Sequence, residues 1–197
     1  MVQPLNKNQW QLSANTGGML IEGENTLQVA PLSSVSIAYG VTQSTTAFAS
    51  TGLSSFYYDI YHYDLGASHE LLHPFNRQPG LTVTTQINRF QIGDQSNVRH
   101  YPQVDINAYW LTPYREDFFY IGTSHWFDLE NNTIKKQSRW MPSLHGGYTL
   151  QGNRYGINFE LKYIAPHKNN RNNLIPYVGI ENQGAFATNI SLSRKFK

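Results

Sequence analysis

Apolar and polar residues alternate through most of this 197-residue chain. The clearest run is residues 154–164, where one face carries Tyr155, Ile157, Phe159, Leu161 and Tyr163, and the other carries Gly156, Asn158, Glu160 and Lys162. Residues 103–111, 140–150 and 186–196 repeat this pattern. A period of two is that of a β-strand with one apolar and one polar face, so the sequence predicts an all-β fold.

The strand signals and the short turns between them predict an antiparallel up-and-down meander of about 10–12 strands. A literal count gives about eleven, whereas a closed bacterial membrane barrel has an even number, so we expect at least one boundary in that count to be wrong. The doubtful places are 17–31, where a small hairpin fits, and 51–56. In 80–92 the alternation slips before Phe90 and Ile92, which predicts a bulge.

The composition changes the picture from soluble to membrane-bound. Charged residues make up only 14% of the chain, against about 25% in typical soluble domains. Aromatic residues also reach 14%, and cysteine is absent, which excludes disulfides and suits an oxidising compartment. The sequence contains no run of 18 apolar residues, the length needed for a membrane-spanning helix. The polar start, MVQPLNKNQW, shows no signal peptide, and we expect a mature form whose leader has been removed.

Aromatic residues gather near the ends of the expected strands. They are Trp10, Tyr39, Tyr101, Trp110, Tyr114, Trp126, Trp140, Tyr155, Tyr163, Phe186 and Phe196. Tyr and Trp at these positions suit the two interfaces of a bilayer. We therefore expect one domain over 1–197, a closed antiparallel transmembrane β-barrel with lipid outside and a polar lumen. A soluble ligand-binding barrel with an apolar interior is the alternative.

The last strand carries a more specific resemblance. FATNISLSRKF has apolar residues at every second position up to Phe196, apart from Thr188 and Arg194. In this and in its general pattern the chain resembles the small outer-membrane β-barrel proteins of Gram-negative bacteria. The resemblance implies location in the cell outer membrane, assembly by the barrel-insertion machinery, and roles that range from adhesion and scaffolding to pores and lipid-modifying enzymes.

One stretch carries a motif of a different kind. His69, Glu70 and His73 form H-E-x-x-H, which binds zinc when the two histidines lie one turn apart on a helix. Pro74 follows directly and leaves room for little helix. We therefore expect a polar connection with one short helical turn, with Leu71 and Leu72 on the barrel rim, and keep the metal site as the lesser alternative.

The polar strand faces supply the other candidate residues. Asp105, Asn107, Asn158, Glu160 and Lys162 share the inward faces of their strands, and we expect them to form a polar lumen network with paired charges. Histidines occur in three expected strands, at His62, His125 and His145. Ser124 and His125 point to opposite faces, whereas Ser143 and His145 share one and would form a catalytic pair only with help from a neighbouring strand.

These observations favour a non-catalytic outer-membrane barrel. We expect a structural or accessory component, associated with a larger outer-membrane complex and in contact with membrane lipid and lipopolysaccharide. No cofactor is expected. The net charge of +2 without a dense basic cluster does not favour nucleic acid. The alternatives are a lipid A or phospholipid hydrolase and, less favoured, the soluble ligand-binding barrel.

Overall fold

Antiparallel strands dominate the computed structural model, which describes residues 2–23, 26–93, 98–113, 116–129, 139–170 and 177–197. The strands are β1 (Trp10–Glu22), β2 (Leu27–Val29), β3 (Leu32–Gly40), β4 (Thr45–Gly52), β5 (Ile60–Leu72), β6 (Gly80–Ile92), β7 (Val98–Leu111), β8 (Phe118–Phe127), β9 (Trp140–Gln151), β10 (Tyr155–Asn169) and β11 (Gln183–Phe196). The helix α1 spans Leu53–Phe56. Within those ranges, no helix has the length and apolar character needed to cross a membrane.

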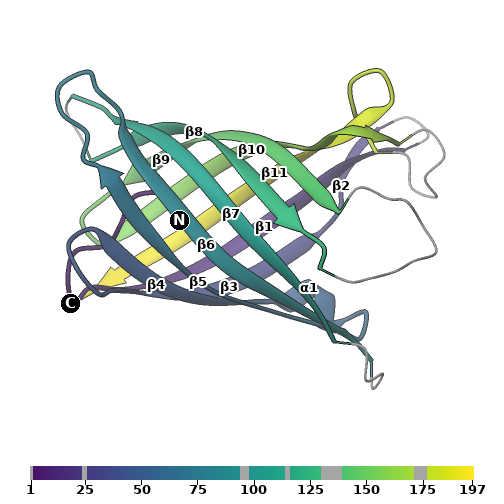
Figure 1. The fold of residues 1–197 in the computed structure, drawn as a ribbon, viewed down its shortest axis with the longest axis horizontal. Coiled ribbons are helices and arrows are strands. Elements are labelled where there is room, and N and C mark those ends of the chain that lie inside the picture. Colours follow the sequence, from purple (N-terminus) through teal and green to yellow (C-terminus); the bar gives the residue numbers. More distant parts are fainter. Residues whose placement is uncertain (1, 24–25, 94–97, 114–115, 130–138, 171–176) are drawn as a thin grey trace.

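The strands close into a barrel (Figure 1). From β3 onward each strand pairs with the next, β1 pairs with β3, and the pairing of β11 with β1 completes the ring. The short strand β2 stands outside this ring and, among the described strands, pairs only with the Leu20–Glu22 end of β1. The described residues thus form eleven strands, of which all but β2 make up the closed wall. The odd count was therefore compatible with an even-stranded barrel, and the hairpin expected within 17–31 is that of β1 and β2.

The two faces of the wall are opposite in character. Outward side chains are apolar and exposed. Leu65, Ile121 and Leu192, for example, are 69%, 59% and 57% exposed. Inward side chains are polar, and Ser68 and Ser124 are fully buried. Apolar area on this scale faces water only at a large cost in free energy, whereas it matches a lipid surround. The arrangement is the reverse of a soluble ligand-binding barrel, so that alternative is wrong.

Aromatic side chains pair on the outside near both ends of the wall. Trp10 and Tyr39 lie with ring centroids 4.6 Å apart on neighbouring strands, and Trp110 stacks on Phe119 at 5.1 Å. At the other end Trp140 stacks on the ring of His125 at 5.8 Å. These pairs agree with the expected interface belts.

Two members of the expected belt lie elsewhere. Tyr101 and Trp126 face the lumen, where both line a cavity, so their assignment to the interface was wrong. Tyr114 lies outside the described residues.

The ends of the barrel differ in their connections. At one end, called here the terminal end, lie Trp10 and Phe196, which pair with each other, together with the turns at 41–44 and 152–154. At the other, called here the loop end, lie α1, the end of β8 with the start of β9, and the end of β10 with the start of β11 (Figure 1). In bacterial barrels the short turns are periplasmic and the long loops extracellular.

The register corrects two sequence predictions. The expected bulge in 80–92 is absent, because β6 pairs without interruption with β7 from Gly80 to Gln91. The register shifts lie instead between Glu70 and Leu72 in β5 and after Ile164 in β10. Phe90 and Ile92 break the apolar alternation because they line the same lumen cavity as Trp126.

Candidate functional site

The H-E-x-x-H stretch is part of a strand. His69 and Glu70 lie in β5 and His73 follows directly, so the short helical turn that we expected is wrong. Alternation sends His69 outward, where its Nδ1 lies 2.9 Å from Thr45 Oγ1. Glu70 points inward and accepts a hydrogen bond from the Tyr109 hydroxyl. Its other oxygen lies 3.2 Å from His73 Nδ1. Throughout the described part of the chain, no three His, Asp or Glu side chains are grouped to hold a metal.

Three of the predicted lumen residues contact side chains from other strands. Asn107 Oδ1 lies 2.7 Å from His145 Nε2. Asn158 Oδ1 accepts hydrogen bonds from Thr149 at 2.9 Å and Tyr120 at 3.2 Å. The Tyr120 hydroxyl also lies 2.9 Å from Glu160 Oε2. These contacts hold β7, β8, β9 and β10 together across the lumen.

The other two predicted residues lie in the same lumen with different surroundings. Asp105 Oδ1 accepts a hydrogen bond from Gln103 Nε2 at 2.8 Å. Lys162 lines a large cavity together with Glu160. Among the described residues, no ion pair joins Lys162 to Asp105 or Glu160. The contacts that these residues make are thus with amides, hydroxyls and the His145 imidazole rather than the paired charges that we expected.

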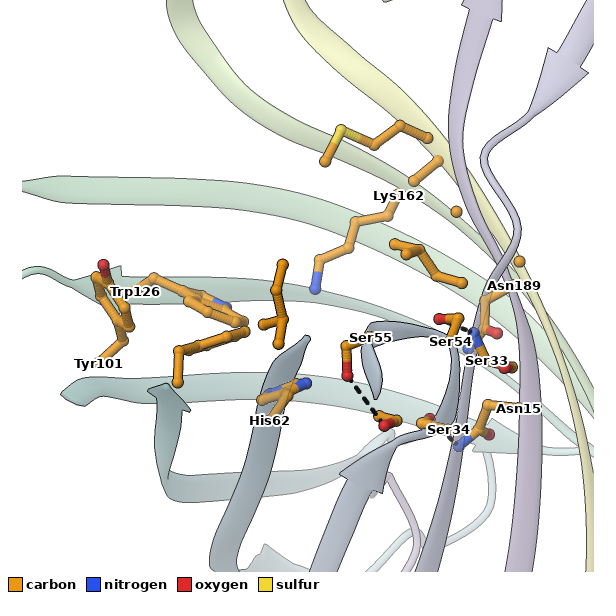
Figure 2. Close-up of a pocket in the computed structure, with 18 of the residues that line it drawn as sticks. Asn15, Ser33, Ser34, Ser54, Ser55, His62, Tyr101, Trp126, Lys162 and Asn189 are labelled. Carbon is orange, nitrogen blue, oxygen red and sulfur yellow. Dashed lines mark hydrogen bonds between the residues drawn. The ribbon is translucent and has the colours of Figure 1, made fainter. Parts of the chain in front are cut away.

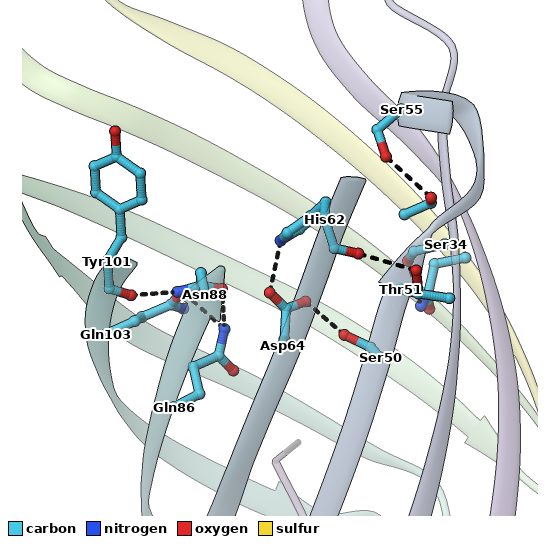
Figure 3. A network of polar contacts seen from close by, with 12 residues as sticks. Ser34, Ser50, Thr51, Ser55, His62, Asp64, Gln86, Asn88, Tyr101 and Gln103 are labelled. Carbon is cyan, nitrogen blue, oxygen red and sulfur yellow. Dashed lines mark hydrogen bonds and ion pairs between the residues drawn. The ribbon is translucent and has the colours of Figure 1, made fainter. Parts of the chain in front are cut away.

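A ladder of amide side chains was missed by the sequence reasoning. Gln103 Oε1 accepts hydrogen bonds from Gln86 at 2.9 Å and Asn88 at 3.1 Å (Figure 3). Its Nε2 donates to Ser124 at 3.0 Å. Asn88 is 1% exposed. Because each amide both donates and accepts, the ladder satisfies buried polar groups on β6, β7 and β8 at once. The sequence could have indicated it, because Gln86 and Asn88 are two residues apart in β6 and so share its lumen-facing side.

A second missed cluster lies on β4 and β5. His62 Nε2 lies 2.6 Å from Asp64 Oδ1, and Ser50 donates to the other carboxylate oxygen at 2.5 Å (Figure 3). The carboxylate stands between the hydroxyl and the imidazole. A nucleophilic serine needs the imidazole beside the hydroxyl instead. The cluster therefore suits structural pairing rather than acyl transfer.

The two serine–histidine pairs considered from sequence also lack this geometry. Ser124 is buried in the lumen, whereas His125 lies outside and accepts a hydrogen bond from the Trp140 indole at 3.2 Å. Ser143 and His145 share the inward face of β9, but within the described residues no hydrogen bond joins them, and His145 Nε2 is bonded to Asn107.

The first residues of the chain enter the lumen at the terminal end. The Leu5 backbone N–H donates to Thr46 Oγ1 at 2.8 Å, and Leu5 is 3% exposed. Val2 packs against the buried aromatic cluster that includes Tyr109 and Tyr120. Gly40 permits this path, because a Cβ there would lie 2.0 Å from the Asn6 carbonyl oxygen. The space left beside residues 2–5 is about 280 Å³.

The loop-end half of the lumen is open and differently lined. It holds a cavity of about 1230 Å³ whose wall includes His62, Phe90, Tyr101, Trp126 and Lys162 (Figure 2). This cavity and the small space at the terminal end have Asn15, Glu160 and Asn189 in common. The two spaces therefore lie next to each other along the lumen, one narrow and occupied at the terminal end, the other wide at the loop end.

Known structures share this architecture. The translocator domain of the autotransporter NalP from Neisseria meningitidis matches with a TM-score of 0.50 and 9% identity over 98% of this chain and 90% of that chain. The porin NanC matches with a TM-score of 0.52 and 12% identity over 94% of this chain and 100% of that chain.

The fold is that of an outer-membrane β-barrel. At these identities the likeness concerns the fold alone. No protein-family model matches the sequence, and no curated protein matches it. The expectation of an outer-membrane β-barrel fold is confirmed.

Proposed function

We propose that this protein is a non-catalytic barrel of the bacterial outer membrane, a structural or accessory component whose lumen is closed to flow. The observation that carries the proposal is the position of residues 2–5 inside the terminal end of the lumen. Buried contacts hold this segment, since Leu5 bonds to β4 and Val2 packs on the aromatic cluster. A filled lumen is the common state of small barrels, in which side chains occupy the interior.

The outer surface supports the membrane location. Its apolar residues and paired aromatic rings suit contact with acyl chains and interfaces, so the direct partners would be membrane lipid and lipopolysaccharide. The strand β2 ends the order of the sheet, and among the described strands only β1 pairs with it. A free strand edge is a site at which another chain can add, which fits an accessory role beside a larger outer-membrane complex.

Recording current across planar bilayers tests the closed lumen. The protein is expected to insert without lasting conductance, because residues 2–5 fill the terminal end. A variant lacking residues 2–7 is expected to give stable current steps. The matched control replaces the exposed Asn6 and Lys7 with serine, keeps the buried Leu5, and should remain silent.

Stable currents from the unmodified protein would contradict the proposal. A deletion variant as silent as the parent would show that residues 2–5 are not what closes the lumen. Flotation of each protein with lipid vesicles establishes insertion independently of current.

A further inference from the structure

An aromatic wall lines the loop-end cavity within an otherwise polar lumen. Phe90, Tyr101 and Trp126 come from the consecutive strands β6, β7 and β8. Their ring centroids are 5.6 Å apart for Phe90 and Tyr101, 6.4 Å for Phe90 and Trp126, and 6.3 Å for Tyr101 and Trp126. The imidazole of His62 on β5 stacks on Phe90 at 4.1 Å with an interplanar angle of 9°. Four neighbouring strands thus contribute one continuous cluster of rings.

Neither contact with the membrane nor packing in a protein core explains the position of these rings. They point inward, so they do not contact acyl chains, and they border a cavity of about 1230 Å³. Apolar surface facing a water-filled space carries a free-energy cost that an apolar ligand would remove. Aromatic faces accept another ring at centroid distances of about 4.5–7 Å, in stacked or edge-to-face contact.

Among the described residues that line this cavity, positive charges outnumber negative ones. Its lining includes four cationic side chains, against two carboxylates. The cations are Arg99, Arg139, Lys162 and Lys168, and the carboxylates are Asp128 and Glu160.

Lys162 is the cation best placed to meet a ligand. Glu160 accepts a hydrogen bond from Tyr120. Lys162 forms no hydrogen bond or ion pair with any described residue. Figure 2 shows its ammonium end extending into the cavity that His62 and Trp126 also face. An ammonium in a partly enclosed space attracts an anion more strongly than one in bulk water.

We propose that this cavity binds a small anionic ligand with a flat ring, of the aromatic carboxylate class. The ring would lie against Phe90, Tyr101 and Trp126, and the carboxylate would face Lys162. Such a ligand satisfies both unusual features of the cavity, since a neutral ring would leave the ammonium unused and a small inorganic anion would leave the aromatic wall exposed. The inference goes beyond the proposed function and does not depend on whether the terminal end is closed.

Calorimetric titration of the protein in zwitterionic detergent tests this inference, with empty micelles as background. The probes are sodium 2-naphthoate and its uncharged analogue 2-naphthylmethanol. We expect naphthoate to bind about tenfold more tightly, as one charge–charge contact in a partly enclosed site can supply. Laurate, an anion with a flexible chain instead of a ring, should bind more weakly than naphthoate.

Paired variants identify the site. Lys162→Gln should abolish the preference for naphthoate, Lys162→Arg should retain it, and the exposed Lys7→Gln is the matched control. Trp126→Leu should weaken both naphthyl probes, whereas Trp140→Leu, on the outer surface, should weaken neither.

Several results would overturn the inference. These are equal affinity for the charged and neutral probes, no binding above the micelle background, or tighter binding of laurate. Full preference in a folded Lys162→Gln protein would show that the anion lies elsewhere. Folding of each variant is read from its heat-modifiable migration on gels.

Discussion

A single buried contact at the terminal end shows how each side chain depends on its face of the wall. Tyr109 is fully buried, and its hydroxyl donates to Glu70, the inward residue of the H-E-x-x-H stretch. His69, the residue before Glu70 in the sequence, points outward, because successive residues of a strand face opposite sides. The separation of His69 from Glu70 follows from this alternation alone.

Removal of the Tyr109 hydroxyl tests that contact. Tyr109→Phe leaves the Glu70 carboxylate without its buried donor, and we expect the free energy of unfolding to fall by about 1–3 kcal/mol. Urea unfolding of the protein in micelles measures this loss. Tyr61→Phe, a half-exposed tyrosine on the outer face of β5, should change stability by less than about 0.5 kcal/mol. An equal effect of the two variants would contradict the role given to the hydroxyl.

The alternation of residues along each strand made some lumen-facing side chains predictable, but not the contacts between them. Alternation alone placed Asn107 and Asn158 on inward faces. Their partners, His145 and Tyr120, come from strands whose alignment depends on the register of the whole ring. The entry of residues 2–5 into the lumen had no signal, because four residues before the first strand are too few to show a period.

At the scale of elements, the strands with one apolar and one polar face were the most predictable. The strands β7, β9, β10 and β11 matched their alternation closely. The predictions failed where the lumen-facing side of a strand becomes apolar, since the inward Phe90 of β6, between the outward Arg89 and Gln91, resembles a register slip. They also failed in β5, where Gly66 and His69 on the two faces obscure the pattern and the end of the strand was taken for a short helical turn.

The seam between the first and last strands is the junction that closes the barrel. Gly17 in β1 pairs with Asn189 of β11 and with Leu32 of β3. Its φ is 155°, and a Cβ there would lie 2.1 Å from the Thr188 carbonyl oxygen. A side chain at this position therefore forces the two strands apart.

We expect Gly17→Ala to destabilise the barrel by about 1–3 kcal/mol, as overpacking against a fixed backbone does. The urea concentration at which the compact, heat-modifiable gel band disappears measures this change. The matched control is Gly146→Ala on the outer face of β9, where the nearest atom to a new Cβ is 3.3 Å away. A Gly17→Ala protein as stable as this control would mean that the seam is looser than described.

At the scale of the whole molecule, the main feature is the arrangement of the two faces of the barrel wall. Apolar side chains point outward, polar ones inward, and the lumen is divided into an occupied terminal end and an open loop end. Composition and alternation predicted the outward apolar and inward polar faces, because low charge and two-faced strands leave few alternatives, but not the division of the lumen. The ring-lined cavity was not predictable, since it joins residues from β5 to β8 with Lys162 of β10, whose shared location only the closed barrel provides.

The central claim is that this outer surface meets lipid. The chain contains no cysteine, so single cysteines placed along β10 can each carry a spin label. In lipid vesicles, labels at Ile157, Phe159 and Leu161 should collide readily with oxygen, which concentrates in the bilayer, and labels at Asn158 and Glu160 should not. We predict that oxygen collision alternates along residues 157–161, high at the odd positions and low at the even ones. Access of a water-soluble nickel reagent to the odd positions, or the absence of alternation, would contradict a membrane barrel.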